Sequence, residues 1–152
     1  MSANEFYKPV GGILAAELFL TRDLSSMEDL ATAQPIAVEL VDDGSLYEEH
    51  FTQENGLVSV SHTLTLRSDR VLAEEWFSVE LMQILAVEGA VARVQMATGE
   101  QITIGYSPRM GFNQALRLES LSFSSGKKPC SSPCVELKLH SRDLCSALSN
   151  SN

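Results

Sequence analysis

The clearest pattern along the chain is an alternation of apolar and polar residues in LVSVSHTLTLRS, residues 57–68. Val58, Val60, Leu64 and Leu66 fall on one face together with His62, while serine, threonine and arginine side chains occupy the other face. A period of two residues is that of a β-strand with one buried face. We therefore predict a half-buried strand here, with the apolar face in the core.

Other segments also have strand patterns. Residues 13–21 are mostly apolar at both odd and even positions, with Glu17 as the exception. This pattern is typical of a strand covered on both faces. Residues 36–41, IAVELV, alternate apolar and less apolar positions. Residues 90–106 predict a β-hairpin that turns at Thr98-Gly99.

The C-terminal third predicts two more paired strands. In ALRLESLSFSS, residues 115–125, the apolar residues change phase in the middle, which predicts a β-bulge near Glu119-Ser120. In VELKLHS, residues 135–141, every second residue from Val135 to Leu139 is apolar and is expected to face the core.

One long helix is predicted over about residues 69–88. Ser68 or Asp69 could cap its start, and Gly89 is a suitable residue just after its end. Its apolar stripe would include Leu72, Trp76, Ile84 and Leu85, with Val79 or Leu81 and with Phe77 also in the core. Such a helix would be roughly 27–30 Å long and could flank one face of a small sheet.

Two polar segments remain. Residues 22–35 are rich in serine, and either a short helix after Ser25 or Ser26 or a long loop fits them. Residues 42–56 are acidic and end at Asn55-Gly56, and we interpret them as a long loop. Long loops in a protein without catalytic motifs are typical of contact surfaces.

These elements predict an α+β fold, mainly antiparallel β, arranged as a barrel or a sandwich with one long flanking helix. The length of 152 residues suits a single domain over 1–152 that can bury a sizeable core. The ends, about residues 1–10 and 146–152, are expected to be loose.

Charge excludes several partners. The chain has 20 acidic and 11 basic residues, for a formal charge of −9, so it lacks the electrostatic footprint of a nucleic-acid-binding protein. Its longest apolar segment, VGGILAAELFL, is too short to cross a bilayer, and its first residues do not resemble a secretory signal. We therefore expect synthesis in the cytoplasm, no membrane partner, and cysteines that stay reduced.

The segment SGKKPCSSPCVELKLHSRDLC, residues 125–145, carries the most evident candidate chemistry. Cys130, Cys134, His140 and Cys145 could form a Cys₃His zinc site, but their spacing differs from the usual ligand pairs. A Cys130–Cys134 disulfide would close only a very small loop. We interpret SGKKPCSSPC as an exposed hairpin loop and keep zinc, with a metal-dependent enzyme, as an alternative.

The other candidates have simpler interpretations. His62 lies on an apolar strand face, which is typical of a core histidine, and His50 lies among Glu48, Glu49 and Glu54 in a segment typical of a solvated surface. Asp42-Asp43-Gly44 lacks the alternating oxygen ligands of a calcium loop. Without a nucleophile elbow, a phosphate loop or an HExxH motif, we predict neither catalysis nor a cofactor.

Several motifs carry a resemblance to small prophage-encoded proteins: HTLTLRSDR, a predicted helix that bears Trp76, ATGEQ, GYSPRMG, and RLESLSFSSG followed by VELKL. They cover somewhat more than half of the chain, and the layout is similar to that of phage tail-tube and related tail proteins. The resemblance implies a barrel or sandwich with a flanking helix, assembly into hexameric rings that stack, and no catalytic residues. The KPCSSPC segment appears only in this chain's version of the pattern.

The expected function is that of a structural virion protein of a tailed phage or prophage, with itself and other tail proteins as partners. The alternative is a small non-enzymatic binding or accessory module of a mobile element. Acidic segments of such a protein could line a channel through which DNA passes without adhering, because like charges repel.

Overall fold

The computed structural model describes residues 12–25, 27–41, 44–69, 73–74, 76–106, 111–112, 114–124 and 134–143. The ends expected to be loose, 1–10 and 146–152, lie outside these residues. The elements in chain order are β1 (Ile13–Leu20), η1 (Thr21–Asp23), η2 (Met27–Ala31), β2 (Ile36–Val38), β3 (Leu46–Glu54), β4 (Leu57–Asp69), α3 (Val79–Val87), β5 (Ala90–Met96), β6 (Gln101–Ile104), β7 (Arg117–Ser124) and β8 (Cys134–Asp143).

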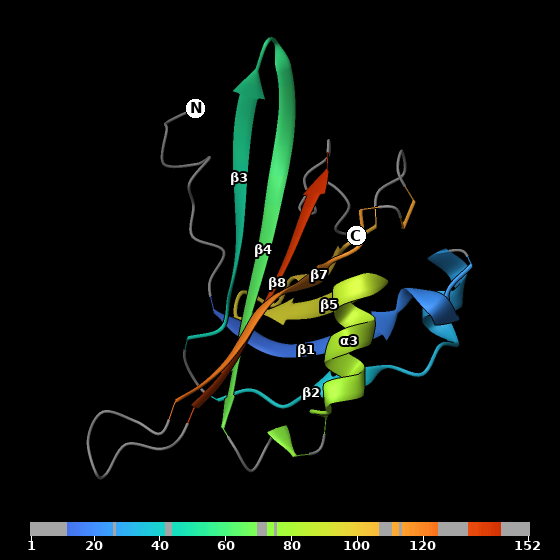
Figure 1. The fold of residues 1–152 in the computed structure, drawn as a ribbon, viewed down its shortest axis with the longest axis vertical. Helices are drawn as coiled ribbons and strands as arrows, with labels where there is room; N and C mark the ends of the chain where they lie inside the picture. The colour runs from blue at the N-terminus through green and yellow to red at the C-terminus, as the bar shows by residue number, and fades with distance from the viewer. Residues whose placement is uncertain are drawn as a thin grey trace.

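The strands form two antiparallel sheets of four strands each. One has the order β2-β1-β5-β6 and the other has the order β3-β4-β8-β7. The strands of the two sheets cross at a steep angle, and the β3–β4 hairpin extends well beyond the other elements (Figure 1). The mainly antiparallel prediction is confirmed in its sandwich form, and closure into a barrel is not seen among the described strands.

The core lies between the two sheets. The apolar face of β4 contributes Leu64 and Leu66, and β8 contributes Leu137 and Leu139, as the alternation predicted. They pack in one cluster with residues of the other sheet and of α3, namely Ile13, Ala16, Leu18, Val38, Ala90, Ala92, Val94, Met96, Ile102, Ile104, Leu81, Met82 and Leu85. Both sheets therefore bury one face against a shared interior.

Backbone contacts also join the sheets at two corners. Ala90 at the start of β5 pairs with Leu116, just before β7. After β2, the Val41 amide donates to the Arg67 carbonyl at 3.0 Å, and the Ser68 hydroxyl donates to the Glu39 carbonyl at 2.6 Å. These hydrogen bonds satisfy backbone groups at the ends of strands that would otherwise lack partners.

Strand β1 is covered on both faces only along its second half. Leu18 faces the main core, whereas Phe19 lies in a smaller cluster with Leu24, Leu30 and Val91 on the opposite face. The η1 and η2 segment supplies that cover. Because η2 begins at Met27, directly after Ser26, the short-helix alternative is confirmed in the form of a 3-10 helix. Near the start of β1, Leu14 is exposed.

The presence of the acidic residue Glu17 in this apolar strand is explained by its neighbour on the adjacent strand. Arg93 lies directly opposite Glu17 in the β1–β5 register, and its Nη2 donates to Glu17 Oε1 at 3.0 Å. The Arg93 guanidinium also lies 4.9 Å from the centre of the Phe19 ring, within cation–π range. The charged pair covers the outer end of the second cluster without leaving a buried unpaired charge.

The long helix predicted over residues 69–88 is wrong. Strand β4 continues to Asp69, and α3 occupies only Val79–Val87. Ser78, rather than Ser68 or Asp69, is its N-cap, because its hydroxyl accepts the Leu81 amide at 3.0 Å. Pairing of β4 with β8 from Val60 to Asp69 outcompetes helix formation at residues 68–69.

Several residues assigned to the helical stripe therefore have other roles. Trp76 is buried before the helix begins, where the Trp76 and Phe77 amides both donate to the Ala73 carbonyl. Phe77 is exposed, so its assignment to the core is wrong, and of the alternatives Val79 and Leu81 it is Leu81 that is buried. Leu72 lies outside the described residues.

Gly89 ends α3 as predicted, with φ at +85°, in the left-handed region that favours glycine. A Cβ at this position would lie 2.7 Å from the Leu116 carbonyl oxygen, which belongs to the strand contact between the sheets. Gly99, at the β5–β6 turn, has a similar φ of +94° but nothing within 4 Å of its Cβ position. A side chain at Gly99 would therefore add only backbone strain, whereas a side chain at Gly89 would add both backbone strain and steric overlap.

We expect Gly89→Ala to destabilise the fold more than Gly99→Ala. Both variants place alanine at positive φ, which costs about 1–2 kcal/mol, but only Gly89→Ala also forces backbone atoms apart. Chemical unfolding of the two variants provides the comparison. Equal losses of unfolding free energy would show that the contact at Leu116 adjusts without cost.

The remaining strand predictions are largely confirmed. The 90–106 hairpin turns through Thr98-Gly99, and the β7–β8 register shifts between Leu118 and Ser120, where the bulge was expected. Two expectations fail on the β3–β4 hairpin. Residues 46–54 form a strand instead of a long loop, and Val58 is 52% exposed, although it shares the face of Leu64.

An exposed ion pair joins η1 to the end of α3. The Arg22 guanidinium hydrogen-bonds the Glu88 carboxylate, which raises the pKa of Arg22 and lowers the pKa of Glu88. Because the pKa of Glu88 is depressed in the folded state, the pair stabilises the fold above the ordinary glutamate pKa and ceases to do so as the pH falls through the lowered value. The effect is small, since water screens both groups.

Candidate functional site

The four zinc candidates are not placed together. Cys134 and His140 both lie on β8, six residues apart, which corresponds to roughly 20 Å along a strand. This separation is far too large for two ligands of one zinc ion. Cys130 and Cys145 lie outside the described residues, and within the described part of the chain no group of three or more histidine, cysteine or acidic side chains is positioned to hold a metal.

Cys134 instead contacts an arginine. Arg67 Nε and Nη2 each lie 3.2 Å from Cys134 Sγ, which can act as a weak acceptor. Cys134 is the first residue of β8. Strand β7 precedes residues 125–133 in the chain and pairs with β8 in antiparallel register. The strands that flank SGKKPCSSPC thus have the antiparallel pairing expected for a hairpin, while residues 125–133 lie outside the described residues.

We expect the Cys130→Ser, Cys134→Ser double variant to melt and assemble like the original protein. Serine keeps an acceptor atom beside Arg67, and no ligand geometry is lost among the described residues. Thermal unfolding and elemental analysis for zinc provide the measurement. Stoichiometric zinc, or melting that collapses on addition of a chelator, would revive the zinc alternative.

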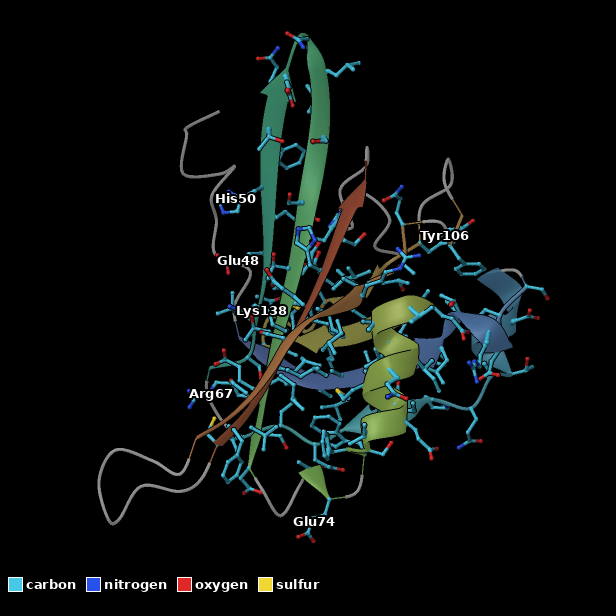
Figure 2. All side chains as sticks on the ribbon, viewed as in Figure 1. Glu48, His50, Arg67, Glu74, Tyr106 and Lys138 are labelled. Atoms are coloured by element: carbon cyan, nitrogen blue, oxygen red, sulfur yellow. The ribbon has the colours of Figure 1, made fainter. Side chains whose placement is uncertain are left out.

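His50 and its acidic neighbours lie on an exposed strand face. Glu48, His50, Thr52 and Glu54 alternate along one side of β3, and all four are exposed. Glu48 and His50 point away from the rest of the fold in Figure 2. The interpretation of this segment as a solvated surface is confirmed for Glu48, His50 and Glu54, although the surface is a strand and not a loop, and it is wrong for Glu49, whose side chain is only 8% exposed.

The opposite side of β3 carries a buried polar group. Tyr47 Oη lies 2.5 Å from Glu49 Oε2 and 2.5 Å from His62 Nδ1. The His62 and Glu49 side chains are only 4% and 8% exposed, and their nearest ring and carboxylate atoms are 3.5 Å apart. His62 is therefore a core histidine as predicted, and its hydrogen-bonding partners come from the segment that was expected to be a loop.

Beyond this group the hairpin leaves the body of the protein. Strand β8 pairs with β4 only as far as Val60, so the rows that join Thr52 to Ser59 and Glu54 to Leu57 have no third strand among the described residues. We call residues 51–60 the hairpin arm. On its outer face the Thr52 and Ser59 hydroxyls lie 3.0 Å apart.

The hairpin arm exposes three apolar side chains. Phe51 is 63% exposed, Leu57 is 76% exposed and Val58 is 52% exposed. In the strand register Phe51 lies opposite Val60 and Val58 lies opposite Gln53, so Phe51 and Val58 are diagonal neighbours on the face that continues the core side of β4. The apolar face of β3 and β4 thus continues from the core into the exposed hairpin arm.

Strand β3 is also the edge of its sheet. Only β4 pairs with it among the described strands, so half of the backbone hydrogen-bonding groups of its nine residues face outward. Exposed edges are sites at which another strand can pair. Glu48, His50 and Glu54 place polar side chains along this edge, which opposes unspecific pairing.

The sequence did contain a signal for this hairpin. Asn55-Gly56 between two alternating segments is a strong indicator of a two-residue β-turn, and both residues have positive φ here, +54° and +82°. The surrounding acids and glutamine concealed it, because only Tyr47 and Phe51 mark the apolar face of residues 46–54.

No family model, curated protein or solved structure matches this chain. No helix in the described part of the chain has both the length and the apolar character needed to cross a membrane.

Proposed function

We propose that the protein is a structural virion protein of a tailed phage or prophage, part of the tail and tube-like, which acts by self-assembly and without catalysis. The observation that carries this proposal is the hairpin arm, which presents Phe51, Leu57 and Val58 to solvent on an extended ribbon. The motif resemblance to small prophage-encoded proteins, which implies a layout similar to that of tail proteins, favours the same role.

The exposure of the arm favours a protein partner. A two-stranded hairpin is marginally stable alone in water, so an arm of this length benefits from a surface that covers it. Covering apolar area contributes about 25 cal/mol per Å². Contact of a neighbouring subunit with the face that bears Phe51 and Val58 would bury these two side chains and extend the core face of β4 across an interface.

The partner that we propose is a second copy of this chain. A protruding arm on one side of the fold and receiving surfaces elsewhere make a heterologous contact, in which different patches of two identical subunits meet. Such contacts produce closed rings when the rotation between subunits closes. A hexameric ring is the arrangement that the resemblance implies, with other tail proteins as further partners and the virion as the location after synthesis in the host cytoplasm.

Electron microscopy and light scattering of the purified protein test this proposal. The proposal predicts rings, stacked rings or tubes, with a mass that is a multiple of the subunit mass. A monodisperse particle with the mass of one chain, at concentrations far above those used for unfolding studies, would contradict it.

The arm equally suits a non-enzymatic accessory module that binds a different protein of a mobile element. The same three apolar side chains and the same free edge would then contact that protein. A protein that remains monomeric alone, but loses binding to one phage partner when the arm is altered, would favour this alternative.

A further inference from the structure

The buried group of Tyr47, Glu49 and His62 sits where the hairpin arm joins the body. Glu49 lies directly opposite His62 in the β3–β4 register, and the next row in the same phase, Phe51 opposite Val60, begins the arm. The Tyr47 and His62 rings are nearly parallel, 9° apart, with centres 6.1 Å from each other. The group therefore connects the two strands at the last covered rows before the hairpin extends into solvent.

The two short contacts of the Tyr47 hydroxyl limit where the protons of this group can lie. A tyrosine hydroxyl carries one proton and can donate only one hydrogen bond. Because Tyr47 Oη lies 2.5 Å from both Glu49 Oε2 and His62 Nδ1, both contacts are hydrogen bonds only if a second proton lies on one of the two partners. The arrangement that keeps the carboxylate ionised has His62 Nδ1–H donating to Tyr47 Oη, which in turn donates to Glu49.

Strand β8 pairs with β4 on the side away from β3. From β8, Ser141 lies opposite His62, and its hydroxyl donates to the Gln114 carbonyl. Asp143 lies opposite Val60, two rows closer to the arm. Leu64, which follows in the same phase of β4, is apolar, and Glu48 and His50 belong to the opposite phase of β3.

We propose that Tyr47, Glu49 and His62 form an acid-sensitive latch that holds β3 to β4 at the base of the hairpin arm. With Glu49 ionised, the hydrogen bonds from His62 through Tyr47 end on a charged acceptor and are strengthened by it. Protonation of Glu49 removes the charge of that acceptor and so weakens the chain of hydrogen bonds that joins the two strands. The latch therefore holds above the pH at which Glu49 takes up a proton and opens as the pH falls through that value.

Amide hydrogen exchange measured by NMR on the intact protein tests the latch. The cross-hairpin amides of β3 and β4 are compared with those of β5 within the same sample, after correction for the intrinsic dependence of exchange on pH. Between about pH 7 and pH 4, which spans the ordinary carboxyl titration, β3 protection should fall at least tenfold relative to β5 protection. The ¹⁵N shifts of the His62 ring should show a proton on Nδ1 at pH 7.

Matched variants assign the effect to these side chains. Glu49→Gln should already show low β3 protection at pH 7 and no further loss in acid, and Tyr47→Phe should do the same while preserving the ring in the core. Glu48→Gln removes a charge one position away on the exposed face and should behave like the original protein. This readout does not require assembly, so it can succeed or fail independently of the proposed virion role.

Two results would overturn the proposal. One is a pH dependence of β3 protection in Glu49→Gln or Tyr47→Phe that equals that of the original protein, which would assign the effect to other acids. The other is a His62 ring whose Nδ1 carries no proton at pH 7, which would remove the hydrogen bond from which the latch is built.

Discussion

Leu64→Ala is expected to lower the free energy of unfolding by about 2–5 kcal/mol. Leu64 is fully buried at the centre of β4 and belongs to the cluster that both sheets share. Replacing it leaves a cavity between the sheets, and strands paired on both sides of β4 restrict how far the site can collapse. Chemical denaturation followed by circular dichroism measures the loss.

The control lies on the same strand. Leu57→Ala removes the same atoms from a side chain that is 76% exposed on the hairpin arm, and the change should stay within about 0.5 kcal/mol. A loss below half a kcal/mol for Leu64→Ala, or similar losses for the two variants, would show that the boundary between core and arm is misplaced.

The second large effect is expected on assembly. Replacing Phe51 and Val58 with threonine removes two apolar side chains from one face of the arm while retaining residues that favour strands. We expect the dissociation constant for self-association to rise at least tenfold, equivalent to about 1.4 kcal/mol. Unfolding free energy should change little, because both side chains are more than half exposed.

A matched variant tests whether any exposed apolar pair has the same effect. Val79→Thr and Val87→Thr remove two exposed apolar side chains from α3, away from the hairpin arm. This variant should assemble like the original protein. If it weakens assembly as much as the Phe51 and Val58 variant does, the arm has no particular role in the interface.

Period-two patterns predicted the core strands well because burial imposes them. Leu64, Leu66, Leu137 and Leu139 recur at every second position and are all fully buried. The same pattern was misleading at Val58, which is 52% exposed and lies beyond the last row in which β8 pairs with β4 among the described residues. Strand alternation indicates which face a side chain occupies, but the extent of the opposing layer is a tertiary property.

The errors at the helix and at β3 have a similar origin. Residues 69–88 contain acceptable caps and helix formers, yet pairing of β4 with β8 as far as Asp69 and the cap at Ser78 place the helix later. Residues 46–54 have weak strand propensity but gain nine paired rows with β4. Tertiary pairing overrides local preference in both places.

The buried polar group could not be read from the sequence for the same reason. His62 was identified as a core histidine from its phase on the strand, but its partners Tyr47 and Glu49 lie on a segment whose register depends on the Asn55-Gly56 turn. Once that turn is recognised, Glu49 falls opposite His62. The composition of residues 46–54 alone predicts only an acidic surface.

The central claim, that the protein assembles with copies of itself, is tested most directly by sedimentation velocity over a range of protein and salt concentrations. The formal charge of −9 opposes association at low salt, and screening acts over roughly 8–10 Å at physiological ionic strength. The sedimentation coefficient should therefore rise with protein concentration, and more steeply at high salt. A single species with the mass of one chain at every protein and salt concentration would contradict the account.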